Sequence, residues 1–257
     1  LCESRHPDGR PIGIDPRHAL RRVLDDASSQ GYSFDIGTEL EFYLLGEDGK
    51  PVGDVIQCYS LSAGAPWESV MRPMRLALDE FGIYVEACNT EYAPGQFEMN
   101  VRYAEALESA DNTVRFKAAV REIANEHGFT ATFMPKPFAG ESGNGMHVHQ
   151  SLLRDGNNVF ADASRGGALG NELMEHYLAG LLAHMPALMF LGGTTVNAYK
   201  RLEEYSFAPM NASWGDDNRT VGIRTVGHGA GRRLEYRAAS ADANPYLIVA
   251  GCIAAGL

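Results

Sequence analysis

The chain has 257 residues, of which 45% are apolar and 21% charged, proportions typical of a globular protein that buries a sizeable core in one or two domains. Acidic residues number 33 against 22 basic ones, and the net charge of -11 argues against a nucleic acid or an anionic membrane as partner. The four cysteines are far apart and include no C-x-x-C pair, so we expect reduced thiols in a cytoplasmic protein, without a zinc site or disulfide framework. The apolar segment 178–191 is too short and too interrupted to span a bilayer.

The hydrophobic pattern predicts strands and helices that follow one another without a regular βαβ alternation. Asp15 and Pro16 predict the start of a helix, because they combine an N-cap residue with proline at the first helical position. Strands joined by hairpins, with long helices between them, predict an α+β fold with a mainly antiparallel sheet. Helices are expected at 16–30, 66–81 (kinked at Pro73), 105–127, 171–190 and from Pro245 onward, and strands at 34–45, 83–88, 96–102, 129–134, 146–153, 158–160, 222–226 and 233–239.

The strand predicted at 34–45 carries two carboxylates on one face. Leu40, Phe42 and Leu44 alternate with Glu39 and Glu41. The apolar side chains would therefore face a core, and the two glutamates would lie about 7 Å apart on the other face. Like charges at this spacing repel, and either water at an exposed strand face or a divalent cation could offset the repulsion. Mg²⁺ and Mn²⁺ prefer carboxylate oxygens as ligands.

Polar pairs spaced two residues apart recur on other predicted strands. His147 precedes His149 at this spacing, and Glu235 precedes Arg237. Taken singly, a histidine is more often a hydrogen-bonded core residue than a ligand, and a glutamate is usually solvated. Several of them on strands with apolar neighbours predict an acidic pocket for two or more divalent ions, because carboxylates without metal would raise each other's pKa values. The candidate ligands are Glu39, Glu41, Glu91, Glu98, His147 and Glu235.

Six arginines near the C-terminal end could complement this acidic pocket. By default each is a surface charge, but an arginine and a glutamate on the same strand face suggest a site for a cation and an anion together, as in metal-assisted phosphoryl transfer. The sequence contains no P-loop, no Rossmann glycine motif and no H-E-x-x-H motif. Phosphoryl transfer, metal-assisted hydrolysis, metal buffering and an acidic structural domain all remain open at this point. The six arginines are Arg201, Arg219, Arg224, Arg232, Arg233 and Arg237.

Seven motifs resemble those of the glutamine synthetase family, in the same order. They are GTELEFY at 37–43, EYAPGQFE at 91–98, MPKP at 134–137, GNGMHVH at 143–149, NAYKRL at 197–202, NR at 218–219 and RLEYR at 233–237. The resemblance extends from about residue 30 to the end and implies a curved, mainly antiparallel sheet flanked by helices. It also implies that residues 1–30 are a linker and first helix after a small N-terminal domain, and that residues 31–257 are a catalytic domain, with the N- and C-terminal parts of the family missing.

The resemblance further implies a role for each candidate residue, with ATP and two or more Mg²⁺ or Mn²⁺ ions as cofactors, in a ring-shaped homo-oligomer. In the implied reaction ATP phosphorylates the γ-carboxylate of glutamate, and ammonia or a primary amine then displaces phosphate to leave a γ-amide. Arg219 would also stabilise the phosphoryl group during its transfer. The matching positions are Glu41, Glu91 and Glu98 for one metal ion; Glu39, His147 and Glu235 for the second; Glu86, His149, Ser151, Arg219 and Arg224 for ATP; and Gly143, Arg201 and Arg237 for glutamate.

Three positions depart from the family pattern. Phe207 stands where the glutamine-forming enzymes have a glutamate that helps to hold ammonium, so we expect an amine with apolar character, as in relatives such as γ-glutamylpolyamine synthetase. Ser142 replaces the usual asparagine of the glutamate-contacting loop. Ala230 falls where a nucleotide-contacting lysine is expected, and His228 or Arg232 could substitute for it. Two alternatives stay open, an ammonia-using glutamine synthetase and an inactive regulatory member of the family.

Overall fold

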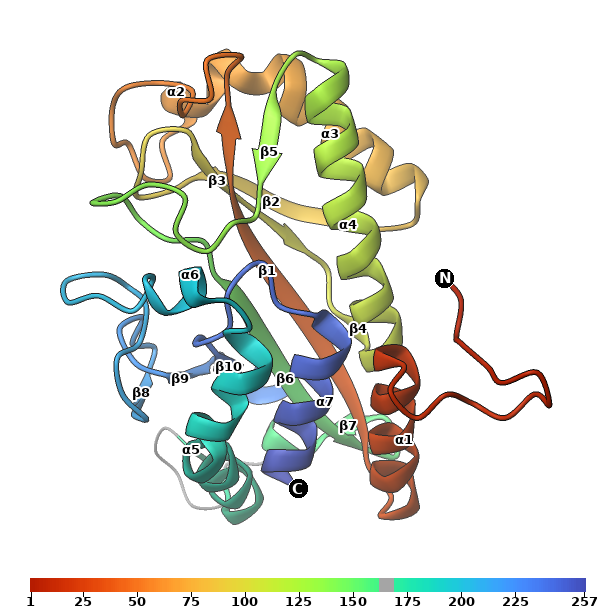
Figure 1. Cartoon of the computed structure of the whole chain (residues 1–257). Coiled ribbons are helices and arrows are strands. Elements are labelled where there is room, and N and C mark those ends of the chain that lie inside the picture. Colours follow the sequence, from red (N-terminus) through yellow and green to blue (C-terminus); the bar gives the residue numbers. More distant parts are fainter. Residues whose placement is uncertain (162–168) are drawn as a thin grey trace.

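The structure, a computed structural model, describes residues 1–161 and 169–257 (Figure 1). The strands among these residues are β1 (Ser33–Leu45), β2 (Val85–Thr90), β3 (Gln96–Val101), β4 (Ala104–Glu105), β5 (Thr130–Thr132), β6 (Met146–Arg154), β7 (Asn157–Asn158), β8 (Trp214–Asp216), β9 (Ile223–Val226) and β10 (Arg233–Tyr236). They form one sheet in the order β2-β3-β1-β6-β10-β9-β8, with β4 and β5 paired to β1 and β7 paired to β6. The described strand pairs are antiparallel except β8 with β9, which confirms the predicted α+β fold with a mainly antiparallel sheet.

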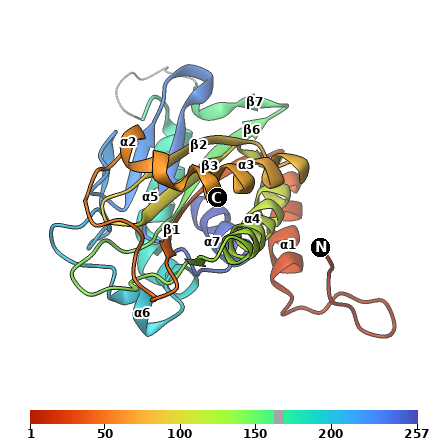
Figure 2. The ribbon, with the colours of Figure 1, turned by 90° about the horizontal axis from the view of Figure 1, so that it is seen from above.

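Four long helices cover one face of this sheet (Figures 1 and 2). They are α1 (Pro16–Ser29), α4 (Ala106–Glu126), α5 (Glu172–Gly192) and α7 (Pro245–Gly256). α7 packs against the other three and is apolar around its whole circumference, as expected of a helix buried on all sides. The helix α3 (Glu68–Glu80) packs on α4, after the short α2 (Leu61–Gly64) and the 3₁₀ turn η1 (Ala65–Trp67). Within the described part of the chain, every helix is too short or too polar to cross a lipid bilayer.

β1 separates the core from the opposite face of the sheet. Its even-numbered residues from Phe34 to Leu44 are buried. Among them, the hydroxyl group of Thr38 forms a hydrogen bond with the hydroxyl group of Thr113 in α4. Its odd-numbered residues, among them Glu39 and Glu41, point to the other face, as the alternation predicts for a half-buried strand. The helices thus leave one face of the sheet free for polar groups.

Some predicted elements differ from those observed. The strand predicted at 158–160 is the short β7 followed by the 3₁₀ turn η2 (Val159–Ala161), because the Asn158 side chain accepts a hydrogen bond from the Phe160 amide and curls the chain. The helix predicted from Pro66 begins at Glu68 as α3, and the segment 193–219 contains two unpredicted elements, α6 (Val196–Tyr199) and β8. The remaining 3₁₀ turn is η3 (Gly229–Gly231), between β9 and β10.

Candidate active site

Four neighbouring strands bring the predicted ligands to the face of the sheet that the helices leave free. Where β1 pairs with β3, Glu41 lies opposite Glu98. Where β1 pairs with β6, Glu39 lies opposite His147. β10 pairs with the other edge of β6 and carries Glu235. Residues directly opposite each other in an antiparallel pair point to the same face, so five residues that are up to 196 positions apart meet there.

Two groups of side chains among the described residues bring their ligand atoms to within 4.8 Å of one another. One group consists of Glu39, His147 and Glu235, and the other of Glu41, Glu98 and His147. His147 thus belongs to both groups, whereas the resemblance assigns it to one. The Nδ1 atom of His147 lies 3.4 Å from a carboxylate oxygen of Glu39 and 3.4 Å from one of Glu235. Carboxylate and imidazole ligands at this spacing suit a divalent ion.

Glu91 lies outside these two groups but lines the same cavity as Glu41 and Glu98. It is 7% exposed, and its Oε1 atom has no hydrogen-bond partner among the described residues. Leaving a buried carboxylate oxygen unpaired is costly, and a cation in the cavity would satisfy it. The set of side chains therefore fits a bound divalent ion.

The charges at this site shift the pKa values of the carboxylates in opposite directions. Burial, together with the charge of Glu41, raises the pKa of Glu91 to about 8. Burial and the neighbouring carboxylates raise the pKa of Glu98 well above its usual range. Burial also opposes the ionisation of Glu39, but His149 and His147 outweigh it and lower the pKa well below the usual range. Glu39, which pairs with both histidines, is thus ionised more readily than Glu91 and Glu98.

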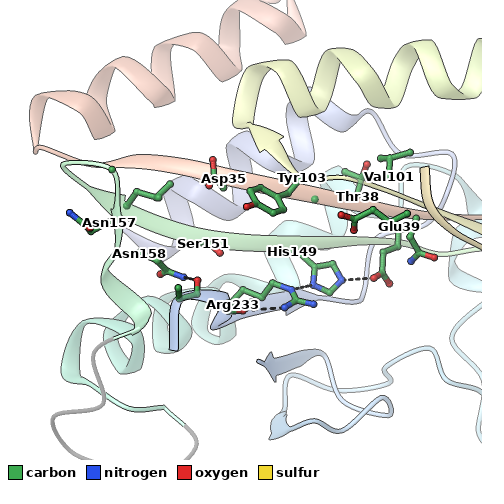
Figure 3. Close-up of a pocket in the computed structure, with 17 residues that line it drawn as sticks. Asp35, Thr38, Glu39, Val101, Tyr103, His149, Ser151, Asn157, Asn158 and Arg233 are labelled. Atoms are coloured by element: carbon green, nitrogen blue, oxygen red, sulfur yellow. Dashed lines mark hydrogen bonds and ion pairs between the residues drawn. The ribbon is translucent and has the colours of Figure 1, made fainter. Parts of the chain in front are cut away.

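A cavity of about 480 Å³ opens beside Glu39 (Figure 3). Three of the residues that the resemblance assigns to ATP line it: Glu86, His149 and Ser151. His149 lies between a carboxylate and a guanidinium group. Its Nε2 atom is 3.0 Å from a carboxylate oxygen of Glu39, and its Nδ1 atom accepts a hydrogen bond of 3.0 Å from Nε of Arg233. Arg233 therefore fixes the orientation of the imidazole ring towards the ligand groups.

The two other residues assigned to ATP lie elsewhere. Arg219 lines the neighbouring cavity, next to Glu91. Arg224 lies opposite Glu235 in the pairing of β9 with β10 and donates to that carboxylate at 3.1 Å. Its guanidinium also pairs with Asp217, whose side chain is 76% exposed. The structure thus brings Glu86, His149 and Ser151 together and places both arginines on the side of the acidic groups.

His147 lines a second cavity of about 120 Å³, as do the residues assigned to glutamate, Gly143, Arg201 and Arg237. Arg201 is 4% exposed and donates to the backbone carbonyls of Ala238 and Arg237. A Cβ atom at Gly143 would lie 2.6 Å from Cγ of Arg201, so glycine is required for this close approach. The cavity therefore presents two buried guanidinium groups, which suit a carboxylate.

The smaller cavity is also lined by residues to which neither the sequence pattern nor the family resemblance gives a role. Tyr59, Tyr92 and Gln96 line it together with Phe207, and the rings of Tyr92 and Phe207 lie 4.7 Å apart. Gln96 precedes Glu98 by two residues on the same strand face, so the period of two could have identified it. Tyr59 lies in a loop without hydrophobic periodicity, and its position becomes evident only from the folded chain.

The free sheet face combines carboxylates, histidines and arginines between two cavities. This combination is typical of enzymes that use divalent ions to transfer a phosphoryl group. Residues 13–257 match the family described as "Glutamine synthetase, catalytic domain". The chain belongs to the glutamine synthetase family, as the motifs of the sequence predict.

Individual relatives include glutamine synthetases and a glutamate–isopropylamine ligase. A glutamine synthetase from Clostridium saccharobutylicum is 40% identical over 263 residues, covering all of this chain and 59% of that protein. A glutamate–isopropylamine ligase from Pseudomonas sp. is 38% identical over 270 residues, covering all of this chain and 59% of that protein. A solved structure described as "GmaS/ADP complex-Conformation 1" is 36% identical, with a TM-score of 0.89 over 98% of this chain and 60% of that one. The chain thus spans about 60% of the length of these proteins.

Proposed function

We propose that this protein is an ATP-dependent ligase that joins the γ-carboxylate of glutamate to an amine through a γ-glutamyl phosphate. The convergence of six ligand-type side chains beside two cavities of complementary character carries the proposal. Glu39, His147 and Glu235 would hold one Mg²⁺ or Mn²⁺ ion. Glu41, Glu91 and Glu98 would hold another. Such ions supply positive charge beside the phosphate oxygens.

The cavity of about 480 Å³ is the proposed nucleotide site. Glu86, His149 and Ser151 line it, and Arg233 orients His149 by a hydrogen bond to its Nδ1 atom. We place the transferring phosphoryl group near Arg219, whose guanidinium would stabilise the charge that develops on it. Arg224 would exchange the exposed carboxylate of Asp217 for a phosphate oxygen, because its pair with Asp217 is accessible from solvent.

The cavity of about 120 Å³ is the proposed glutamate and amine site. Arg201 and Arg237 would bind a carboxylate of glutamate and so orient its γ-carboxylate towards the nucleotide. An oxygen of that γ-carboxylate attacks the terminal phosphorus of ATP, and ADP leaves. The amine nitrogen then attacks the carbonyl carbon, loses a proton, and phosphate leaves. Because phosphate is a far better leaving group than an oxide ion, the first step makes the second possible.

Labelled glutamate tests the reaction. The protein is incubated with ATP, Mg²⁺, an amine and L-glutamate that carries ¹⁸O in its γ-carboxylate, and the released phosphate is analysed by mass spectrometry. The proposal predicts one ¹⁸O atom per phosphate and release of ADP that requires glutamate. ADP release without glutamate, or phosphate free of label, would contradict it. A protein that binds glutamate and nucleotide without releasing ADP would instead be a regulatory member of the family.

For the amine we propose a primary amine with apolar character. The ring of Phe207 packs against Tyr92 at the edge of the smaller cavity, where it offers an apolar surface rather than a carboxylate. The similarity to the glutamate–isopropylamine ligase supports this choice. Ammonia is the second candidate, because the relatives also include glutamine synthetases of 40% identity. Turnover with ammonia, ethylamine, isopropylamine, ethanolamine and putrescine separates the two, and fastest turnover with ammonia would refute our choice.

A further inference from the structure

The thiol of Cys58 lies against one of the proposed metal ligands. Cys58 is half-buried, and its Sγ atom donates a long hydrogen bond of 3.9 Å to Oε2 of Glu91. Glu91 is 7% exposed, and its other carboxylate oxygen, Oε1, has no hydrogen-bond partner among the described residues. A buried acceptor without a partner is rare in proteins and indicates that a ligand lies against it. A sulfur atom thus adjoins a carboxylate that still has an oxygen to offer.

Hydrogen bonds to Thr90 hold the loop that carries Cys58 in place. Thr90 directly precedes Glu91, and its backbone carbonyl accepts a hydrogen bond of 2.8 Å from the amide of Tyr59. Its hydroxyl group donates to the carbonyl of Gln57 at 2.7 Å. Tyr59 has a φ of 59°, a left-handed conformation that is rare outside glycine and persists only where the surroundings enforce it. The loop therefore fixes the sulfur atom beside the carboxylate of Glu91.

A sulfur ligand changes which ions a carboxylate site prefers. Carboxylate oxygens suit Mg²⁺ and Mn²⁺, whereas a thiolate favours softer ions such as Zn²⁺. Burial and the charges of Glu91 and Glu98 raise the pKa of the Cys58 thiol to about 11, so the sulfur keeps its proton until a cation displaces it. The wide spacing of the four cysteines predicts no zinc site, and a position that combines one cysteine with glutamates arises only in the folded chain.

We propose that Cys58 is a sulfur ligand at the metal position that includes Glu91, and that this position takes Zn²⁺ in preference to Mg²⁺ and Mn²⁺. The ion replaces the proton of the thiol, and that proton passes to solvent. This inference rests on the metal position of the proposed function and deepens it, because the glutamates alone would prefer the harder ions. Zn²⁺ bound through sulfur would compete with Mg²⁺ for the same place.

Spectroscopy with Cd²⁺, a soft analogue of Zn²⁺, detects a metal–sulfur bond directly, because a thiolate bound to Cd²⁺ has a charge-transfer band in the ultraviolet. We expect the wild-type protein to develop this band on titration with Cd²⁺ and Cys58→Ser to lack it. Serine keeps the size of the side chain and offers a hard oxygen in place of the sulfur. Competition with a chromophoric chelator should show Zn²⁺ binding weakened about ten- to hundredfold in Cys58→Ser, and Mn²⁺ binding changed less than about threefold.

Cys88 provides the matched control. It is half-buried in β2, where its thiol interacts with the side chain of Arg75. Cys88→Ser should keep both the Cd²⁺ band and the affinity for Zn²⁺. A band that persists in Cys58→Ser, or an equal loss of Zn²⁺ and Mn²⁺ affinity in that variant, would overturn the inference.

A measurement on the wild-type protein tests the inference even if Cys58→Ser does not fold. Iodoacetamide alkylates free thiols, and peptide mapping by mass spectrometry gives the rate at each cysteine. Zn²⁺ should protect Cys58 in proportion to the occupied fraction of the site, and the same concentration of Mg²⁺ should not. The exposed Cys2 should react at one rate throughout. Equal protection of Cys58 by the two ions, or none by Zn²⁺, would contradict the proposal.

The outcomes distinguish this inference from the function on which it rests. If the wild-type protein transfers ¹⁸O to phosphate but gives no band with Cd²⁺, Cys58 only donates a hydrogen bond to Glu91, and the inference alone is overturned. If the band appears in a protein that transfers no label, the proposed reaction fails, whereas the sulfur ligand stands.

Discussion

At the scale of single residues, His147 is the side chain that both groups of candidate ligands share. Its replacement by alanine should therefore remove a ligand of one proposed ion and a neighbour, within 4.8 Å, of Glu41 and Glu98, which would hold the other. We expect His147→Ala to lower the affinity for Mn²⁺ at least tenfold, since the loss of a metal ligand or of its supporting partner costs about ten- to hundredfold. Titration followed by electron paramagnetic resonance measures free Mn²⁺ directly.

His176 provides the control for this experiment. It lies in α5 with a side chain that is 73% exposed, remote from the free sheet face. His176→Ala should bind Mn²⁺ as the wild-type protein does. Unchanged binding of Mn²⁺ by His147→Ala would show that the two groups are ion-pair clusters rather than metal ligands.

Phe207 decides the amine preference on our account. Its ring is 40% exposed and packs against Tyr92, so Phe207→Ala removes part of an apolar wall at the smaller cavity. We expect kcat/KM for isopropylamine to fall about tenfold, which corresponds to about 1.4 kcal/mol of lost apolar contact. The value for ammonia should change by less than about threefold.

Tyr205 is the matched control, an aromatic residue two positions earlier in the same segment that is fully exposed. Tyr205→Ala should leave both kinetic values as they are. If Phe207→Ala slowed the reactions of ammonia and isopropylamine by the same factor, Phe207 would be a packing residue. That result would favour ammonia over an apolar amine as the substrate.

The sequence predicts those residues of the site that the period of two places on the polar face of a strand. Glu39, Glu41, His147 and Glu235 each lie on a strand with apolar neighbours, so the period of two places them on the polar face. Which of them meet depends on the register between strands far apart in the chain. Two features follow from that register and are revealed by no local pattern: His147 belongs to both groups of candidate ligands, and Arg233 donates a hydrogen bond to His149.

At the scale of elements, an ion pair joins three of the helices that support the sheet. Asp111 of α4 accepts two hydrogen bonds from Arg17 of α1, both 2.8 Å long, and one of 2.7 Å from the hydroxyl group of Tyr246 in α7. Burial opposes the ionisation of Asp111, but the hydrogen bonds from Arg17 and Tyr246 outweigh it, so its pKa lies below the usual range. The carboxylate thus couples helices that are distant in the chain.

We predict that Asp111→Asn lowers the free energy of unfolding by about 2 kcal/mol at pH 7, since it weakens a partly buried pair and leaves Arg17 without part of its partner. The folded pKa of Asp111 is lowered, so the unfolded chain binds its proton more tightly. The contribution is fully present above the unfolded pKa, near 3.9, and is lost as the pH falls through the folded pKa. Urea unfolding at pH 7 and pH 3 measures both values, and the difference between wild type and variant should shrink at pH 3.

If the free energies of unfolding of the wild type and Asp111→Asn differed by the same amount at pH 7 and pH 3, ionised Asp111 would not be the source of the stabilisation. Arg75→Gln is a suitable control, because Arg75 pairs with the half-exposed Glu68 inside α3 and should contribute less than about 1 kcal/mol.

The elements follow from local sequence where a cap or a periodic face defines them. Asp15 accepts a hydrogen bond from the amide of His18 at the start of α1, as its N-cap position predicts. β8 and α6 are too short to show a period, although Thr195 caps the start of α6 by accepting a hydrogen bond from the amide of Ala198. The parallel pair of β8 and β9 depends on the return of the chain between Asp216 and Ile223, which the sequence does not specify locally.

At the scale of the whole molecule, four helices cover one face of the sheet (Figure 1). The candidate metal ligands lie on the other face. β1 holds the side chains of the site in fixed positions, because its even-numbered residues from Phe34 to Leu44 are buried beneath the helices. The site thereby rests on strands rather than on loops, which favours the fixed geometry that phosphoryl transfer requires. The chain covers about 60% of the length of its relatives, and this part contains all six candidate metal ligands.

We propose that these six side chains bind a pair of divalent ions. Crystals of the protein grown with Mn²⁺ and a non-hydrolysable ATP analogue test it through the anomalous signal of manganese. We predict two peaks, each about 2.0–2.4 Å from its ligands, one at Glu39, His147 and Glu235 and the other at Glu41, Glu91 and Glu98. Manganese peaks at other residues, or no peak on the free face of the sheet, would contradict the account.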